Sequence, residues 1–134
     1  MQKILAMATA TVFTSVGTAS AEWVKATSDN DAISYYVDAA SIKKASGSLS
    51  ASILTNNVYT PASKNASAVG LILVNCESRT VRNQRVTIYT QQMGRGDVVE
   101  TKELDQTIKI GANSGERSNQ NEKSLEAIFN FICR

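Results

Sequence analysis

Hydrophobic and polar side chains alternate along most of this chain, which is the pattern of β-strands with one buried and one exposed face. Ile33, Tyr35 and Val37 occupy every second position of one such stretch. In chain order the pattern predicts strands at 22–27, 33–38, 48–59, 68–76 and 82–90, separated by polar or glycine-containing breaks such as 43–47.

The stretch at 68–76 differs from the others because both of its sets of alternate positions are apolar. One set is Val69, Leu71 and Leu73, and the other is Ile72, Val74 and Cys76. A strand of this kind is expected at the centre of a sheet, covered on both faces, or on one face and by a partner on the other.

Beyond residue 90 the alternation weakens. Gly94-Arg95-Gly96 predicts a tight turn, and Val98-Val99 predicts the start of a further strand. The residues at 101–110 are ambiguous, with a short strand expected around Ile108 and Ile110. A polar loop is expected at 111–120.

The last part of the chain changes its period from two to about 3.6. Leu125, Ile128, Phe129 and Ile132 are spaced to form one apolar stripe of a helix. Asn119 and Glu122 predict a capping pair at its start. The fold class is therefore α+β: an antiparallel sheet with one C-terminal helix packed on its face.

The first 21 residues predict a signal peptide rather than part of the fold. A short positive start and an apolar run precede Ala19-Ser20-Ala21, the small-x-small pattern of a cleavage site. Cleavage would leave 22–134 as a single domain, with no integral membrane segment. We expect the protein to be exported, either periplasmic or secreted, with no cysteine near the cut to carry a lipid.

Composition narrows the class of partner. Without Lys3 the chain has 13 basic and 12 acidic residues, so its net charge is near +1. This balance gives no reason to expect nucleic acid as a partner. The hydrophobic content of 43% suits a globular core rather than disorder.

Cys76 and Cys133 are the only cysteines. In an exported chain, two cysteines predict one disulfide, and close metal-ligand spacing is absent. Both cysteines are expected to point toward the same buried layer, one from the central strand and one from the helix. The bridge would stabilise the domain by about 4 kcal/mol on the chain-entropy model.

Candidate catalytic and metal-binding patterns are weak. The chain has no histidine, which excludes histidine-dependent triads and histidine-ligated metals. Ser41-Ile42-Lys43-Lys44 matches the Ser-x-x-Lys pattern of serine acyl-enzymes, and Asp29-Asn30-Asp31 resembles the start of a calcium loop, but each is better explained as a turn. Glu100 and Glu103 lie in polar surroundings. We expect no catalytic residue, metal or cofactor.

The tripeptide Arg95-Gly96-Asp97 is a sequence that many integrins read. The glycines at 94 and 96 are explained by the backbone angles of a tight turn, so a structural turn is the favoured interpretation. An exposed turn between strands is nevertheless where a recognition loop would lie. These three residues are therefore the candidate binding residues.

Several features, in this order and spacing, resemble the surface-adhesin protein E-like family. They are Glu22-Trp23-Val24, Tyr36-Val37-Asp38 with Ser41-Ile42, the apolar strand ending in Asn75-Cys76, the pattern Met93-Gly94-x-Gly96-x-Val98-Val99, and a cysteine near the C-terminus. The resemblance implies a sheet of about six strands whose concave face holds the C-terminal helix, tethered by the Cys76–Cys133 bridge. It also implies an adhesin that binds host matrix proteins.

Three functions follow as hypotheses. The leading one is a non-enzymatic binding module for a host matrix protein or another envelope macromolecule. The second is a periplasmic enzyme inhibitor that acts through the loop at Gly94–Asp97 or at Pro61–Ala66. The third is a structural envelope protein that forms a homodimer through an unpaired sheet edge.

Overall fold

The structure, a computed structural model, describes residues 21–29, 33–57, 66–111 and 120–134. The predicted signal peptide, apart from Ala21, lies outside the described residues. So do most of the loop at Pro61–Ala66, Asn30 and Asp31 of the predicted turn, and the predicted cap Asn119.

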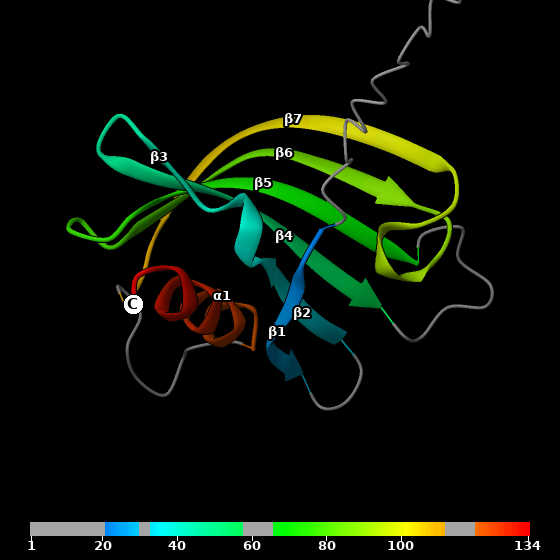
Figure 1. Cartoon of the computed structure of the whole chain (residues 1–134), viewed down its shortest axis with the longest axis horizontal. Coiled ribbons are helices and arrows are strands. Elements are labelled where there is room, and N and C mark those ends of the chain that lie inside the picture. Colours follow the sequence, from blue (N-terminus) through cyan, green and yellow to red (C-terminus); the bar gives the residue numbers. More distant parts are fainter. Residues whose placement is uncertain (1–20, 30–32, 58–65, 112–119) are drawn as a thin grey trace, which may run out of the picture.

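Seven strands form one antiparallel sheet, drawn in Figure 1. The strands are β1 (Trp23–Asp29), β2 (Ile33–Asp38), β3 (Lys43–Ala45), β4 (Ser48–Asn57), β5 (Ser67–Asn75), β6 (Thr80–Tyr89) and β7 (Val98–Lys109). Their order is β1-β2-β4-β5-β6-β7, and β3 pairs with β4 beside β2. Short 3-10 turns, η1 (Ala39–Ser41) and η2 (Gln92–Gly94), join β2 to β3 and β6 to β7.

The single helix, α1 (Gln120–Ile132), packs under the arch of the sheet (Figure 1), which confirms the predicted fold class. Its apolar stripe is buried as the period indicated, since Ile128, Phe129 and Ile132 are each at most 6% exposed. The sheet side of this core consists of Val37, Ala51, Ile72, Val74, Val81 and Ile110. Residues from four strands, β2, β4, β5 and β6, meet the helix, so burying its stripe fixes the register of the sheet.

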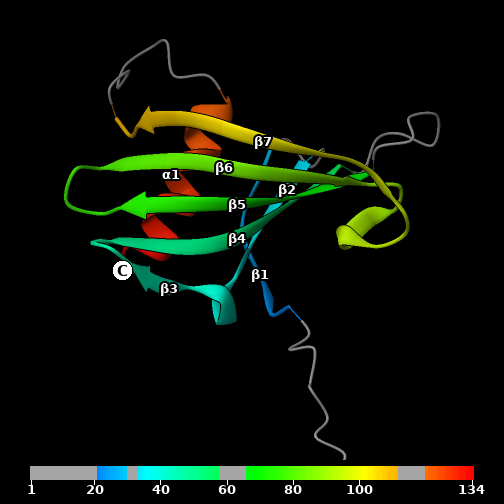
Figure 2. The same ribbon diagram turned by 90° about the horizontal axis from the view of Figure 1, so that it is seen from above.

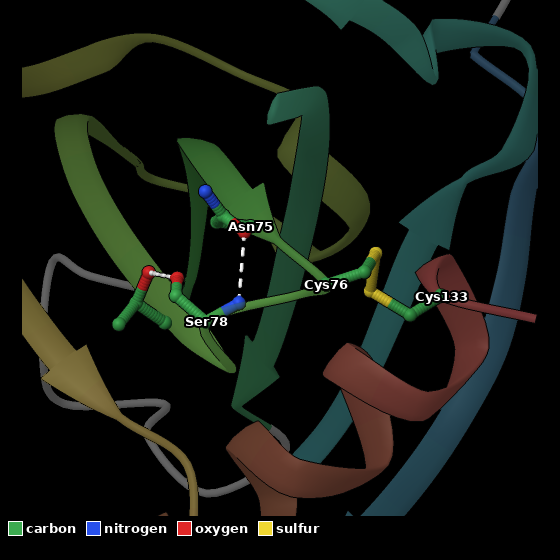
Figure 3. Close-up of a disulfide and its surroundings, with 5 residues drawn as sticks. Asn75, Cys76, Ser78 and Cys133 are labelled. Carbon is green, nitrogen blue, oxygen red and sulfur yellow. Dashed lines mark hydrogen bonds between the residues drawn. A yellow bond between two sulfur atoms is a disulfide. The ribbon is translucent and has the colours of Figure 1, made fainter. Parts of the chain in front are cut away.

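The predicted Cys76–Cys133 disulfide is present, with a Cα–Cα distance of 5.7 Å (Figure 3). Its place differs from the prediction. Cys76 lies in the turn just after β5 and is exposed, while Cys133 directly follows the last residue of α1 and is half-buried. The bridge is therefore at the rim of the core and closes one end of the sheet. Arg79 in the same turn adds a cation–π contact, 5.0 Å from the centre of the Phe129 ring.

Two strand predictions need correction. The segment at 43–47, expected to be a polar break, contains the strand β3 and a turn at Ser46 and Gly47, both with positive φ. The ambiguous region at 101–110 belongs, except for Ile110 in the turn that follows, to β7, one continuous strand of 12 residues. Both strands lie at a margin of the sheet, where side chains stay in water and no apolar alternation is required. The third strand ends at Asn57, and its expected last residues lie outside the described part of the chain.

Candidate functional site

The segment 90–97 joins β6 to β7 at the end of the sheet away from the C-terminus, as Figures 1 and 2 both show. Met93 and Gly94 are half-buried, whereas Arg95, Gly96 and Asp97 are exposed. We call the whole segment the η2 loop (90–97). Its inner half packs on the protein, and its outer half faces solvent.

The inner half packs on the face of the sheet opposite α1. Leu54 is completely buried and lies next to Ile53 in β4, and Ile53 packs on the helix side. Because successive side chains of a strand point to opposite faces, Leu54 points away from the helix. A Cβ placed on Gly94 would lie 3.1 Å from Val69 Cγ2 and 3.8 Å from Leu54 Cδ1, so the loop backbone rests directly on these side chains.

Two buried polar side chains hold the loop in place. Asn56 is 6% exposed, and its Oδ1 accepts a hydrogen bond of 2.9 Å from the Met93 amide. Ser67 is 4% exposed, and its Oγ accepts a 2.9 Å bond from the Gly94 amide and donates one to the Gln91 carbonyl. Buried polar groups are expensive unless they are bonded, so these side chains stabilise this one loop conformation above others.

The backbone angles of the loop agree with the turn that the sequence predicted. Gly94 and Gly96 have φ values of +67° and +82°. Met93 also adopts a left-handed conformation, with φ 62°, which costs about 1–2 kcal/mol for a residue with a side chain. The hydrogen bond from its amide to Asn56 offsets part of this strain.

The exposed half is closed at its base by Thr90. The Thr90 amide donates to the Asp97 carbonyl at 3.0 Å, and the Asp97 amide donates to Thr90 Oγ1 at 2.9 Å. A further bond of 3.2 Å joins the Gln91 amide to the Arg95 carbonyl. In the part of the chain that the structure describes, neither Arg95 nor Asp97 is in a salt bridge, so both charged groups are available to a partner.

The strand that leaves the loop is unusually exposed. Val98 and Val99 are 55% and 43% exposed, and Leu104 is 37% exposed. The candidate residues Arg95, Gly96 and Asp97 are therefore followed directly in the chain by two exposed valines. Exposed apolar side chains next to exposed charges are typical of protein-binding surfaces.

The other candidate residues have structural roles. Ser41 Oγ donates to the Asp38 carbonyl at 2.7 Å and accepts from the Ser52 amide at 2.9 Å, in the gap between β2 and β3. Lys44 pairs with Leu49 across the β3–β4 hairpin. The Ser41 hydroxyl is therefore bonded to backbone groups of the sheet, which is a structural role.

The acidic candidates are also separated. Glu103 Oε1 accepts a 2.7 Å hydrogen bond from Arg85, and Glu100 lies 3.7 Å from the Lys102 ammonium. Each carboxylate is thus neutralised by its own cation. Among the described residues no group of three or more His, Cys, Asp or Glu side chains could hold a metal ion.

A cavity of about 320 Å³ lies beside the disulfide, at the opposite end of the sheet from the η2 loop. Its lining includes the apolar side chains of Leu49 and Val74, together with Cys76 and the exposed Lys44 and Glu77. No pattern in the sequence indicated this cavity, since its residues come from two hairpins distant in the chain. The buried residues Asn56 and Ser67 were also missed, because a polar residue within a strand is ordinarily assigned to the exposed face.

Comparison with known proteins identifies relatives of this fold. The family model for surface-adhesin protein E matches residues 23–134. The structure of crystal form II of Haemophilus influenzae protein E is 17% identical, with 72% of this chain and 81% of that chain covered and a TM-score of 0.51. The selenomethionine form of the same protein is 19% identical, with 74% and 78% covered and a TM-score of 0.52.

Identities this low show similarity of fold only. No curated protein matches the chain by sequence. Within the described residues, no helix is long and apolar enough to cross a membrane.

Proposed function

We propose that this chain, which belongs to the surface-adhesin protein E family, is an exported binding module that attaches to a protein partner through the η2 loop. The partner class is a host matrix protein or another macromolecule of the envelope. The contact residues are Arg95, Gly96 and Asp97. The family supports adhesion in general, and the geometry of the loop supports the particular surface.

One observation carries this assignment: the loop is held from below while its charged residues face solvent. Binding residues are commonly placed on loops that a rigid scaffold positions, because a loop ordered beforehand loses less entropy on binding. Here Asn56 and Ser67 bond the inner backbone, and the Arg95 and Asp97 side chains extend from the outer half. A loop that served only to connect two strands would not need these buried polar contacts.

The test is binding of the purified 22–134 domain to immobilised matrix proteins and to envelope extracts. The double variant Arg95→Ala/Asp97→Ala should weaken the interaction at least about tenfold if the two charges act as binding hot spots. The matched control is Lys44→Ala/Glu77→Ala, which removes one cation and one carboxylate from exposed positions at the other end of the sheet. Equal binding by both variants would overturn the assignment of the loop.

Location is tested separately. Proteinase treatment of intact cells should degrade the protein if it is displayed at the surface, which adhesion to a host requires. Complete protection, with degradation only after the envelope is opened, would restrict the partner to an envelope macromolecule.

Inhibition of an envelope enzyme is the second candidate, and the anchored loop is also the observation that favours it. Protein inhibitors commonly insert a loop of fixed conformation into an active site, so that little order is lost on binding. The structure supports this role for Gly94–Asp97 only, because most of Pro61–Ala66 lies outside the described residues. A panel of hydrolases assayed with micromolar domain would detect it, and uniform lack of inhibition would remove it.

A further inference from the structure

The strand β7 forms one edge of the sheet along its whole length. It pairs with β6 on one side, and in the described parts of the chain no element pairs with its other side (Figure 2). Eleven of its 12 residues are exposed. The outer edge therefore presents a row of backbone amides and carbonyls to which another extended chain can bond.

Proteins usually protect such an edge with proline, with charged side chains, with bulges or with a short strand. β7 has only some of these devices: its last residue, Lys109, forms no salt bridge in the described residues, and its pairing with β6 has two register shifts. The only proline of the chain is Pro61, and the strand is long. Its other four charged side chains are bound within the sheet: Asp105 to Arg82 at 3.0 Å, Glu103 to Arg85 at 2.7 Å and Glu100 to Lys102 at 3.7 Å.

The charge along β7 specifies what kind of strand fits. β7 carries three carboxylates and two ammonium groups, with the second ammonium group at its last residue, whereas the full chain has a net charge of +2. Glu103 and Asp105 lie two residues apart, so they share one face of the sheet. Their side chains are 70% and 77% exposed, although each already bonds an arginine of β6. A strand added outside β7 would place its own side chains beside these carboxylates.

We propose that β7 accepts an extended basic segment of a partner protein as an additional strand of the sheet. Backbone hydrogen bonds to the open edge supply affinity, as in other cases of strand addition. Two lysine or arginine side chains, two residues apart, then bind Glu103 and Asp105 from the side opposite to Arg85 and Arg82. The inference rests on the proposed binding function and adds the chemistry of the partner and its mode of attachment.

A second copy of this chain fits the same edge less well. In the two symmetric antiparallel registers that keep nearly all of β7 paired, Glu103 lies opposite either Glu103 or Asp105 of the other copy. Like charges directly opposite one another destabilise a strand pair, whereas opposite charges stabilise it. The edge is thus better matched to a basic partner segment than to itself.

Two peptides of the length of β7 test the proposal with the purified 22–134 domain. Both alternate valine with polar residues, and they differ only in carrying either two lysines or two glutamates at adjacent positions of the polar face. The lysine peptide should bind about tenfold more tightly, because two cross-strand charge pairs change from repulsive to attractive. It should also slow hydrogen exchange of β7 amides.

The variant Glu103→Lys/Asp105→Lys should invert this preference. Glu77→Lys/Glu126→Lys, which makes the same change of net charge at exposed positions outside β7, should not. The proposal would be overturned if the two peptides bound equally, or if the lysine peptide slowed hydrogen exchange outside β7 instead. It would also be overturned if the control variant inverted the peptide preference, or if the domain were already a dimer joined through β7. Since Arg95→Ala/Asp97→Ala is tested on whole matrix proteins, failure of the peptide test leaves the role of the η2 loop intact.

Discussion

The two faces of the sheet are covered by different chemistry. On the helix side, Ile128, Phe129 and Ile132 pack against the strands, and a covalent bridge closes the end. On the other face, the η2 loop rests on Leu54 and Val69 but is held mainly through the polar side chains of Asn56 and Ser67. Apolar packing is non-directional, whereas hydrogen bonds fix particular atoms. The first arrangement supplies stability and the second specifies the shape of one loop.

The largest expected effect comes from the helix side. Cys76→Ser/Cys133→Ser removes a bridge between residues 57 positions apart, so the free energy of unfolding should fall by about 4 kcal/mol. Urea denaturation of the variant and the oxidised parent measures the difference. Because the η2 loop lies on the other face, we also expect the folded variant to bind the partner of the η2 loop as tightly as the parent does. Loss of binding in the folded variant would show that the faces are coupled.

Ser67→Ala should have the largest effect on the loop side. It leaves the Gly94 amide and the Gln91 carbonyl without their buried partner, which should cost about 3 kcal/mol of unfolding free energy. Ser78→Ala makes the same chemical change where the hydroxyl is exposed and bonds Thr80 Oγ1, so it should cost at most about 0.5 kcal/mol. Similar costs for the two variants would mean that Ser67 does not anchor the loop.

Gly96→Ala tests how closely the loop backbone is confined. A Cβ at this position would lie within 3.0 Å of Thr90 Oγ1 and 2.8 Å from Gln91 Cγ. At Gly47, which has the same φ of +82°, nothing lies within 4 Å. Thermal denaturation should therefore show a loss of about 1 kcal/mol for Gly47→Ala, from left-handed strain alone, and about 2 kcal/mol for Gly96→Ala. Equal losses would mean that the loop adjusts freely.

The smallest effect is expected at the open edge. Arg85→Ala removes a salt bridge whose side chains are 53% and 70% exposed, so its effect on stability should be below about 0.5 kcal/mol. Chemical denaturation at low and high salt would measure it. A loss above about 1 kcal/mol would show that β7 is held to the sheet by its charges rather than by its backbone pairing with β6.

The same contrast between faces explains what the sequence could predict. The helix, the disulfide pairing and the strands with a buried face were predicted, because burial imposes a period on their residues. The sequence predicted only the two ends of β7 as strand. The side chains of β7 are exposed on both faces, so no period shows, and its order comes from pairing with β6. β3 is only three residues long, too short for any period to show.

The site divides in the same way. The turn was predicted from Gly94 and Gly96, whose positive φ values the structure confirms. The anchors Asn56 and Ser67 could not be predicted, since they lie 37 and 27 residues before the amides that they bind and meet the loop only in the folded chain. A pattern of polar residues within strands gives no sign of which ones will be buried.

Hydrogen exchange at the Met93 and Gly94 amides tests the central claim most directly, that buried polar side chains hold the η2 loop in one conformation. In the parent domain both amides should exchange slowly despite their place in a surface loop, because Asn56 and Ser67 accept their hydrogen bonds. In Asn56→Ala the Met93 amide should lose this protection, while the amide of Val74 in the central strand keeps its own. Fast exchange of Met93 and Gly94 in the parent domain would contradict the account.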